Sequence, residues 1–295
     1  MEFVKEVSHQ VSFSTFYLNE VLTDLADLAL GCELNGNRVN IFCYADDIAL
    51  LAPTESALQS MLDTLAPKLE KLSLKINVAK SCNIVFKHKS RKISTNLVLQ
   101  GQSLKQVSEC TYLGVVLMDN LACTSDMERS KRTFFKQHNS IYQKFSYVDT
   151  NVLLYLFRMH AMSFYGIETW FMKLHKKDLN NISGVYHKAI KRICGRNSYD
   201  SNHECLEYAR LSIFKHLLAR KFICYAHRLF TSKSPCLMIH KHYLKYNSVF
   251  RNSLERFFSE NYQVTNVFDN PLCSIISRID FVQRTEPRSV GYEPG

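Results

Sequence analysis

The chain has 295 residues, of which 46% are hydrophobic and 22% charged, a balance typical of globular proteins and unlike that of disordered chains. The N-terminus lacks the apolar core of a signal peptide. The most apolar long window, residues 151–171, is interrupted by Arg158, His160 and Glu168, which excludes a membrane span. We therefore expect a soluble intracellular protein, nuclear or cytoplasmic, that is not secreted.

The net charge of +10 is concentrated in the middle of the chain. Residues 1–127 carry a net charge of −3, residues 128–228 carry +11 and residues 229–295 carry +2. Such a basic segment favours a polyanionic partner such as nucleic acid. A basic surface that only keeps the protein soluble remains the alternative.

The first predicted elements are a helix and a hairpin. Residues 13–30 carry apolar side chains at helical spacing, and Gly31 is the expected stop. Residues 32–53 then predict strands around an Asn-Gly turn at 35–36, with a second break at Asp46–Asp47.

A helix over 55–74 follows, with Thr54 or Ser56 as its cap, and Pro67 should kink or shorten it. Further strands are predicted over 82–87, 95–101 and 107–118. The order helix, hairpin, helix, strands indicates an α+β fold.

Strand signals nearly vanish after residue 120. Helices are predicted over 124–145, 150–172, 176–194 and 204–230. The tail from residue 231 is polar, contains several prolines and is expected to be irregular. The sequence therefore predicts three parts, which are residues 1–120, 121–230 and 231–295.

Two adjacent carboxylates, Asp46 and Asp47, interrupt the apolar run FCYADDIALLAP. Ionised carboxylates are costly to bury without a cationic partner, so the pair is expected on an exposed turn or around a cation. Mg²⁺ is usually held by one or two carboxylates together with substrate phosphates. Two such ions can stabilise the attacking and leaving oxygens of phosphoryl transfer.

The Tyr-Ala-Asp-Asp of this run resembles the catalytic hairpin of reverse transcriptases. SFSTFYLNEVLTDL, KLSLKINVAKSCNIVF and CTYLGVVL resemble further motifs of the non-LTR (LINE-type) retrotransposon enzymes. HAMSFYGIETWF, KAIKRICGRN and LARKFICYAHRLF resemble their thumb and the helical segment beyond it. The resemblance extends over residues 10–230 in the family order. It implies the C-terminal part of a palm, with helices on an antiparallel sheet, followed by a mostly α-helical thumb.

The resemblance also implies roles for single residues. Asp46 and Asp47 would bind Mg²⁺, Tyr44 would lie near the primer end, and Lys80 would lie near the incoming nucleotide, where it could protonate pyrophosphate. The primer grip would consist of Tyr112, Leu113 and Gly114. Strand packing for Tyr44, a solvated lysine for Lys80 and a simple turn at 112–114 are the structural alternatives.

The basic segment interleaves cations with aromatic residues, as a thumb that follows a duplex backbone would. The partners implied are an RNA template and a DNA primer, bound as an RNA–DNA duplex. The nucleic-acid contacts expected here are Lys131, Arg132, Lys191 and Arg192.

The sequence departs from the family at its N-terminal side. No F-x-D pattern, which would supply a third catalytic carboxylate, precedes Tyr44, and Glu6 stands where the template motif has glycine. We therefore expect an N-terminally truncated reverse transcriptase whose isolated chain does not polymerise. The alternatives are a non-catalytic nucleic-acid-binding module in residues 128–228, and an inert product with an exposed sheet edge.

Overall fold

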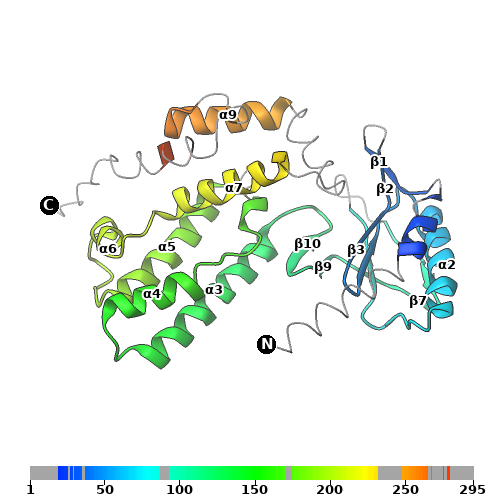
Figure 1. Cartoon of the computed structure of the whole chain (residues 1–295), viewed down its shortest axis with the longest axis horizontal. Coiled ribbons are helices and arrows are strands. Elements are labelled where there is room, and N and C mark those ends of the chain that lie inside the picture. Colours follow the sequence, from blue (N-terminus) through cyan, green and yellow to red (C-terminus); the bar gives the residue numbers. More distant parts are fainter. Residues whose placement is uncertain are drawn as a thin grey trace. The chain divides into compact units, whose positions relative to one another are not determined.

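The computed structural model describes residues 19–25, 27–28, 30–34, 37–86, 93–170, 175–231, 248–264, 267, 275 and 278–279. The chain divides into two compact units, Met1–Ala122 and Cys123–Gly295 (Figure 1). The first unit combines short strands with helices, and the second is helical.

The first unit begins with a helix that is tied to the following strands. Residues 19–25 are helical, while residues 13–18 of the predicted helix lie outside the described part of the chain. The buried Asn40 donates a hydrogen bond from Nδ2 to the carbonyl of Leu25 at 2.9 Å. Gly31 has φ +120°, and a Cβ at this position would lie 2.4 Å from the Cβ of Asn40. Glycine is therefore required at position 31, where the backbone passes close to Asn40.

The predicted hairpin over 32–53 forms two antiparallel ladders. Strand β1 (Cys32–Leu34) pairs with β2 (Asn37–Val39), and β3 (Ile41–Tyr44) pairs with β4 (Asp47–Leu50). The predicted Asn-Gly turn at 35–36 lies outside the described residues.

Helix α2 (Glu55–Lys71) confirms the predicted helix and its cap, because Thr54 Oγ1 accepts a hydrogen bond from the backbone N–H of Ala57 at 3.2 Å. The helix continues past Pro67, so the expectation that proline would shorten it is wrong. A proline inside a helix costs about 3 kcal/mol. The buried Leu65 and Leu69 on either side offset this, since each buried leucine contributes about 1.5–3 kcal/mol.

The remaining strands of the first unit are short. They are β5 (Cys82–Ile84), β6 (Val98–Leu99), β7 (Gln102–Ser103), β8 (Lys105–Val107), β9 (Glu109–Tyr112) and β10 (Val115–Met118). The described strands form five separate two-stranded ladders, of which the β5–β8 ladder is parallel. The expected antiparallel sheet is therefore not observed as one sheet, because most of these short strands pair only with the neighbour to which a tight turn connects them.

The predicted strand over 107–118 is in fact two strands with a hairpin turn. Residues Leu113 and Gly114 connect β9 to β10, with φ +47° and +77°. A two-residue turn with positive φ at both positions matches the right-handed twist of the strands that it joins.

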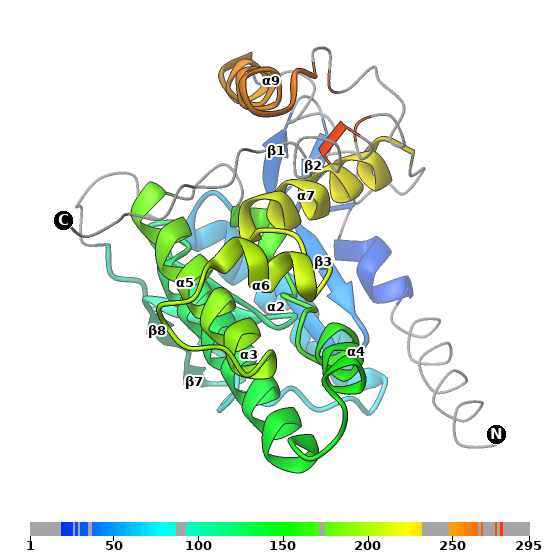
Figure 2. The same ribbon diagram turned by 90° about the vertical axis from the view of Figure 1, so that its left-hand side faces the viewer.

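The second unit contains six described elements before residue 232. They are α3 (Thr124–Phe145), α4 (Thr150–His160), η1 (Ile167–Trp170), α5 (Lys176–Ile193), α6 (Asn202–Tyr208) and α7 (Phe214–Thr231). Helix α3 packs against α4 and α5, and α7 packs against α5 and η1 (Figure 2). No described helix is long and apolar enough to cross a membrane.

The helix predictions for 124–145 and 176–194 are confirmed to within one residue. The prediction for 150–172 extends too far, since α4 ends at His160 and the chain turns through Phe164 and Gly166, both at positive φ. The prediction for 204–230 joins two helices that Arg210, at φ +50°, separates. Apolar periodicity continues across these turns because the turn residues also face the core.

The prediction that residues 231–295 are irregular is wrong for helix α9 (Ser248–Tyr262). Leu254, Phe258 and Tyr262 are fully buried in the same core as α3 to α7. Their four-residue spacing places them on one face of the helix. The prolines that suggested an irregular tail lie outside this helix.

Candidate active site

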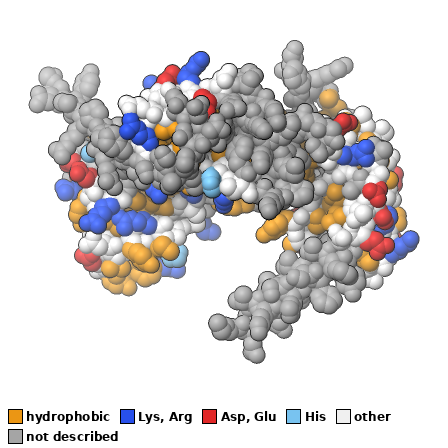
Figure 3. Space-filling model, turned by 45° about the horizontal axis from the view of Figure 1, so that its top comes forward, with side chains coloured by type: hydrophobic (Ala, Val, Ile, Leu, Met, Phe, Trp, Pro, Cys, Tyr) orange, Lys and Arg blue, Asp and Glu red, His pale blue; other side chains and the backbone are white. Residues whose placement is uncertain are grey.

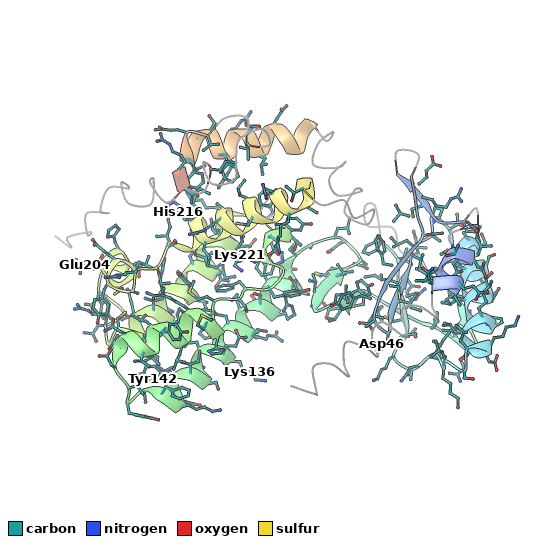
Figure 4. The ribbon with its side chains drawn as sticks, in the orientation of Figure 1. Asp46, Lys136, Tyr142, Glu204, His216 and Lys221 are labelled. Carbon is teal, nitrogen blue, oxygen red and sulfur yellow. The ribbon has the colours of Figure 1, made fainter. Side chains whose placement is uncertain are left out.

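Asp46 and Asp47 lie at the turn of the β3–β4 ladder. Asp46 belongs to the turn, and Asp47 is the first residue of β4. Tyr44 pairs with Asp47, which leaves Ala45 and Asp46 as the two turn residues. Ala45 has φ +53°, a region that residues other than glycine rarely adopt. Both carboxylates are exposed, and Figure 4 labels Asp46 at the turn end of the ladder. The apolar flanks therefore do not bury the charged pair.

One face of this hairpin packs on helices, which fixes the position of the turn within the first unit. The helical residues 19–25 and α2 contribute Val21, Leu25, Met61 and Leu65 to this core. The hairpin residues packed against it are Ile41, Cys43, Ile48 and Leu50. Because side chains alternate along a strand, these four share one face, and Tyr44 and Asp47 lie on the other.

The chemistry of Asp46 and Asp47 suits a hard divalent cation, because both offer carboxylate oxygens on an exposed turn. Within the described ranges, no three His, Cys, Asp or Glu side chains are grouped closely enough to hold a metal. The two aspartates could thus supply two ligands for Mg²⁺, with further ligands from water or substrate.

Tyr112 lies near this turn, which joins two of the predicted motifs in space. The pKa of the Tyr112 phenol is raised first by burial, then by the charge of Asp47 and then by Cys43. Its hydroxyl oxygen is buried and has no hydrogen-bond partner among the described residues. The β9–β10 hairpin is therefore close enough to the β3–β4 turn for Asp47 to influence Tyr112.

The other predicted residues of the first unit differ in their surroundings. Tyr44 is 66% exposed, so packing within the strand does not account for its side chain. Lys80 is exposed in a turn, where its backbone N–H donates to the carbonyl and the side-chain oxygen of Asn77, both at 3.1 Å. No described contact joins Lys80 to Asp46 or Asp47. Leu113, which is partly exposed, and Gly114 form the β9–β10 turn.

The predicted basic contacts of the second unit are not equivalent. Arg132 is exposed, and Lys131 forms an ion pair with Glu128 at 2.7 Å. Lys191 is buried, and its Nζ donates to the carbonyl of Ser198 at 2.7 Å. This ammonium group stabilises the loop that contains Ser198, so the prediction that Lys191 contacts nucleic acid is wrong.

Arg192 lies beside the surface of α3. Its guanidinium is 4.2 Å from the centroid of the Tyr142 ring and donates to Oδ1 of Asn139 at 3.2 Å. Stacking of this kind holds the cation in one orientation while leaving part of it accessible.

The sequence pattern indicates Arg132, Phe135 and Lys136 on α3, but not Asn139 and Tyr142, the two residues that Arg192 contacts. Spacings of three and four residues place Arg132, Phe135, Lys136, Asn139 and Tyr142 on one side of the helix. Arg132, Phe135 and Lys136 are exposed, and Figure 4 labels Lys136 and Tyr142 on α3. The signal was available in RTFFKQHNSIYQK, which contains no acidic residue.

Comparison with known proteins concerns the first unit. Residues 11–117 match the family model described as reverse transcriptase (RNA-dependent DNA polymerase). No curated protein matches the chain. The matched segment contains Asp46, Asp47 and Tyr112, and it ends within β10. The hairpin with the two aspartates thus lies in a segment that is similar to reverse transcriptases.

Proposed function

We propose that residues 11–117 are the C-terminal part of the palm of a non-LTR retrotransposon reverse transcriptase. Asp46 and Asp47 would bind Mg²⁺ for nucleotidyl transfer from deoxynucleoside triphosphates to a DNA primer on an RNA template. The observation that carries the proposal is the exposure of both carboxylates at the turn of a hairpin that otherwise packs on a core.

Asp46, Asp47, Tyr44 and Lys80 have distinct parts in this proposal. Bound Mg²⁺ would supply Lewis-acid stabilisation of the charge that develops on the transferred phosphate. Asp46, in the turn, and Asp47, at the start of β4, orient the two carboxylates toward solvent, where a triphosphate can approach. Tyr44, largely exposed and on the face of Asp47, would contact the primer end. Lys80 would lie near the incoming nucleotide and donate a proton to the leaving pyrophosphate.

Polymerisation in the family also needs a third carboxylate, and no F-x-D pattern precedes Tyr44 in these residues. Loss of one ligand removes much of the charge stabilisation on which this mechanism depends. We therefore expect no polymerase activity from the 295-residue chain alone. A palm strand with the missing aspartate would have to be added to it.

The test adds the fingers and first palm strand of a non-LTR reverse transcriptase to the N-terminal side of the chain. The expected result is Mg²⁺-dependent incorporation of dNTPs on an RNA template, reduced about 100- to 1,000-fold by Asp46→Ala. Asp63→Ala, which changes an exposed aspartate on α2, is the matched control. Incorporation that survives Asp46→Ala would rule out the proposal.

A second candidate function is sequence-independent nucleic-acid binding by the second unit, which the acid-free α3 face favours. Arg132, Lys136 and Arg192 would contact phosphates, so affinity for an RNA–DNA duplex should fall steeply with salt. Arg132→Gln and Lys136→Gln should each lower the slope of log K against log salt by about 1. Asp46→Ala should leave binding unchanged. Affinity that does not vary with salt would exclude this function.

A further inference from the structure

Helix α4 has an exposed apolar face in addition to the face that it buries. Leu153, Leu154 and Phe157 are buried in the core of the second unit. On the other side, Val152, Tyr155 and Met159 are 48%, 59% and 61% exposed. Spacings of three and four residues place these three side chains on one stripe of the helix.

The loop before α4 adds a further exposed aromatic residue. Tyr147, two residues before the N-cap Asp149, is 81% exposed. We call Tyr147, Val152, Tyr155 and Met159 the α4 apolar face. Two tyrosines in this group expose their rings to solvent. Single exposed apolar residues are common on protein surfaces, whereas a group of them indicates a binding surface.

The charge of the two helices that meet at the α4 apolar face is positive in excess. Residues 126–160 contain six Lys and Arg and three acidic residues, of which Asp126 and Glu128 pair with Arg129 and Lys131. The carboxylate of Asp149 already accepts a hydrogen bond from the backbone N–H of Asn151 at 2.8 Å, as the helix cap. Lys144 and Arg158 are exposed near the two ends of the face, and the Arg158 guanidinium also donates a hydrogen bond to the carbonyl of Ala209. Figure 3 shows orange hydrophobic groups beside blue Lys and Arg groups on the surface of the second unit.

A ligand for this surface must therefore be apolar and anionic at once. Single-stranded nucleic acid has both properties, because its bases stack on aromatic rings while its phosphates contact Lys and Arg. A duplex hides the faces of its bases, so it would leave the tyrosine rings without a stacking partner.

We infer that the α4 apolar face binds single-stranded nucleic acid, with bases stacked on Tyr147 and Tyr155 and phosphates near Lys144 and Arg158. This inference goes beyond the proposed palm chemistry and differs from duplex binding on the α3 face. It depends on neither Asp46 nor Asp47. A stacking surface of this kind would hold an unpaired strand without regard to its sequence.

The experiment measures the affinity of the full chain for a fluorescent 20-nucleotide oligo-dT and for a blunt RNA–DNA duplex of equal length. Tyr155→Ala and Tyr147→Ala should each weaken oligo-dT binding about 5- to 150-fold, which corresponds to about 1–3 kcal/mol per stacked base. Duplex affinity should not change. Tyr155→Phe, which keeps the ring, should bind like the wild type.

Tyr199→Ala is the matched control, because Tyr199 is a 98% exposed tyrosine of the same unit outside the α4 apolar face. Met159→Glu places a carboxylate on the α4 apolar face. Because the carboxylate repels phosphate, this variant should weaken oligo-dT binding even if one tyrosine compensates for the loss of the other. Unchanged oligo-dT affinity in both alanine variants overturns the inference. The inference is also overturned if an acidic amphipathic peptide displaces oligo-dT and binds more tightly, because the α4 apolar face would then be a protein-binding surface.

The same measurements with Asp46→Ala separate this inference from the proposed polymerase. Oligo-dT binding should be unaffected by that substitution. Failure of polymerisation with normal, tyrosine-dependent oligo-dT binding would count against the palm proposal alone.

Discussion

Tyr112 has a hydroxyl group that is buried without a hydrogen-bond partner in the described part of the chain, and the charge of Asp47 contributes to the rise of its pKa after burial. An unsatisfied buried hydroxyl costs about 1–3 kcal/mol. Tyr112→Phe should therefore leave the free energy of unfolding unchanged or raise it by about 1 kcal/mol, as urea denaturation would measure. Destabilisation by more than 1 kcal/mol would show that the hydroxyl forms a hydrogen bond in the native protein.

His138 makes the stability of the second unit depend on pH. Its ring is buried beside Phe134 and Phe157, and burial, followed by the charge of Arg192, lowers its pKa from 6.5 to about 4. The unfolded chain therefore binds a proton more readily than the folded chain. The contribution of the neutral His138 to the free energy of unfolding should be fully present above pH 6.5. It should decrease as the pH falls toward 4, by at most about 1.4 kcal/mol per pH unit.

Urea denaturation between pH 7.5 and 4.5 measures this effect against His138→Phe, which keeps a planar ring and cannot titrate. As the pH falls, the free energy of unfolding of the wild type should decrease more than that of this variant. His187, whose pKa is also lowered, is present in both proteins and cancels. A difference that does not vary with pH would mean that His138 is not held neutral.

At the scale of the elements, two glycines should respond in opposite directions to alanine. Gly31→Ala places a Cβ 2.4 Å from that of Asn40 at φ +120° and should destabilise the first unit by about 2 kcal/mol or more. Gly184 lies inside α5 with open space around its missing side chain. Gly184→Ala should therefore stabilise the second unit by about 1 kcal/mol.

Urea denaturation of both variants gives the two values. Equal effects of the two substitutions would contradict the assignment of Gly31 as the position where the chain passes close to Asn40. The β3–β4 hairpin depends on this passage, because Asn40 directly precedes β3 and is anchored to Leu25.

At the scale of the whole molecule, the second unit should fold by itself. Its core cluster draws only on residues between Met127 and Ile279, and the two clusters of the first unit draw on none of these. The chain has one tryptophan, Trp170, which is buried in the second unit and donates from Nε1 to the buried carboxylate of Asp126 at 2.8 Å. Its fluorescence therefore reports this unit alone.

Residues 123–295, expressed alone, should unfold in one cooperative urea transition of tryptophan fluorescence, with a free energy in the usual range of about 5–15 kcal/mol. The midpoint should equal that of the same signal in the full chain. A gradual transition, or a clearly lower midpoint, would mean that the second unit needs the first for its stability.

Local features were predictable from the sequence because short-range forces determine them. The periodicity of α3 and α5, the cap at Thr54 and the exposed pair Asp46–Asp47 follow from side-chain spacing and from the cost of burying charge. The family resemblance also followed from these local patterns, and residues 11–117 match the reverse transcriptase model.

Only the tertiary structure decided which distant residues meet. It brought Tyr112 near Asp47, buried Lys191 under a loop carbonyl, placed Arg192 on the ring of Tyr142 and packed α9 into the core. The physical reason is that burial and long-range contact depend on the packing of whole elements. A sequence pattern shows that a side chain is basic or apolar, but only the packed chain decides which of its faces remains in water.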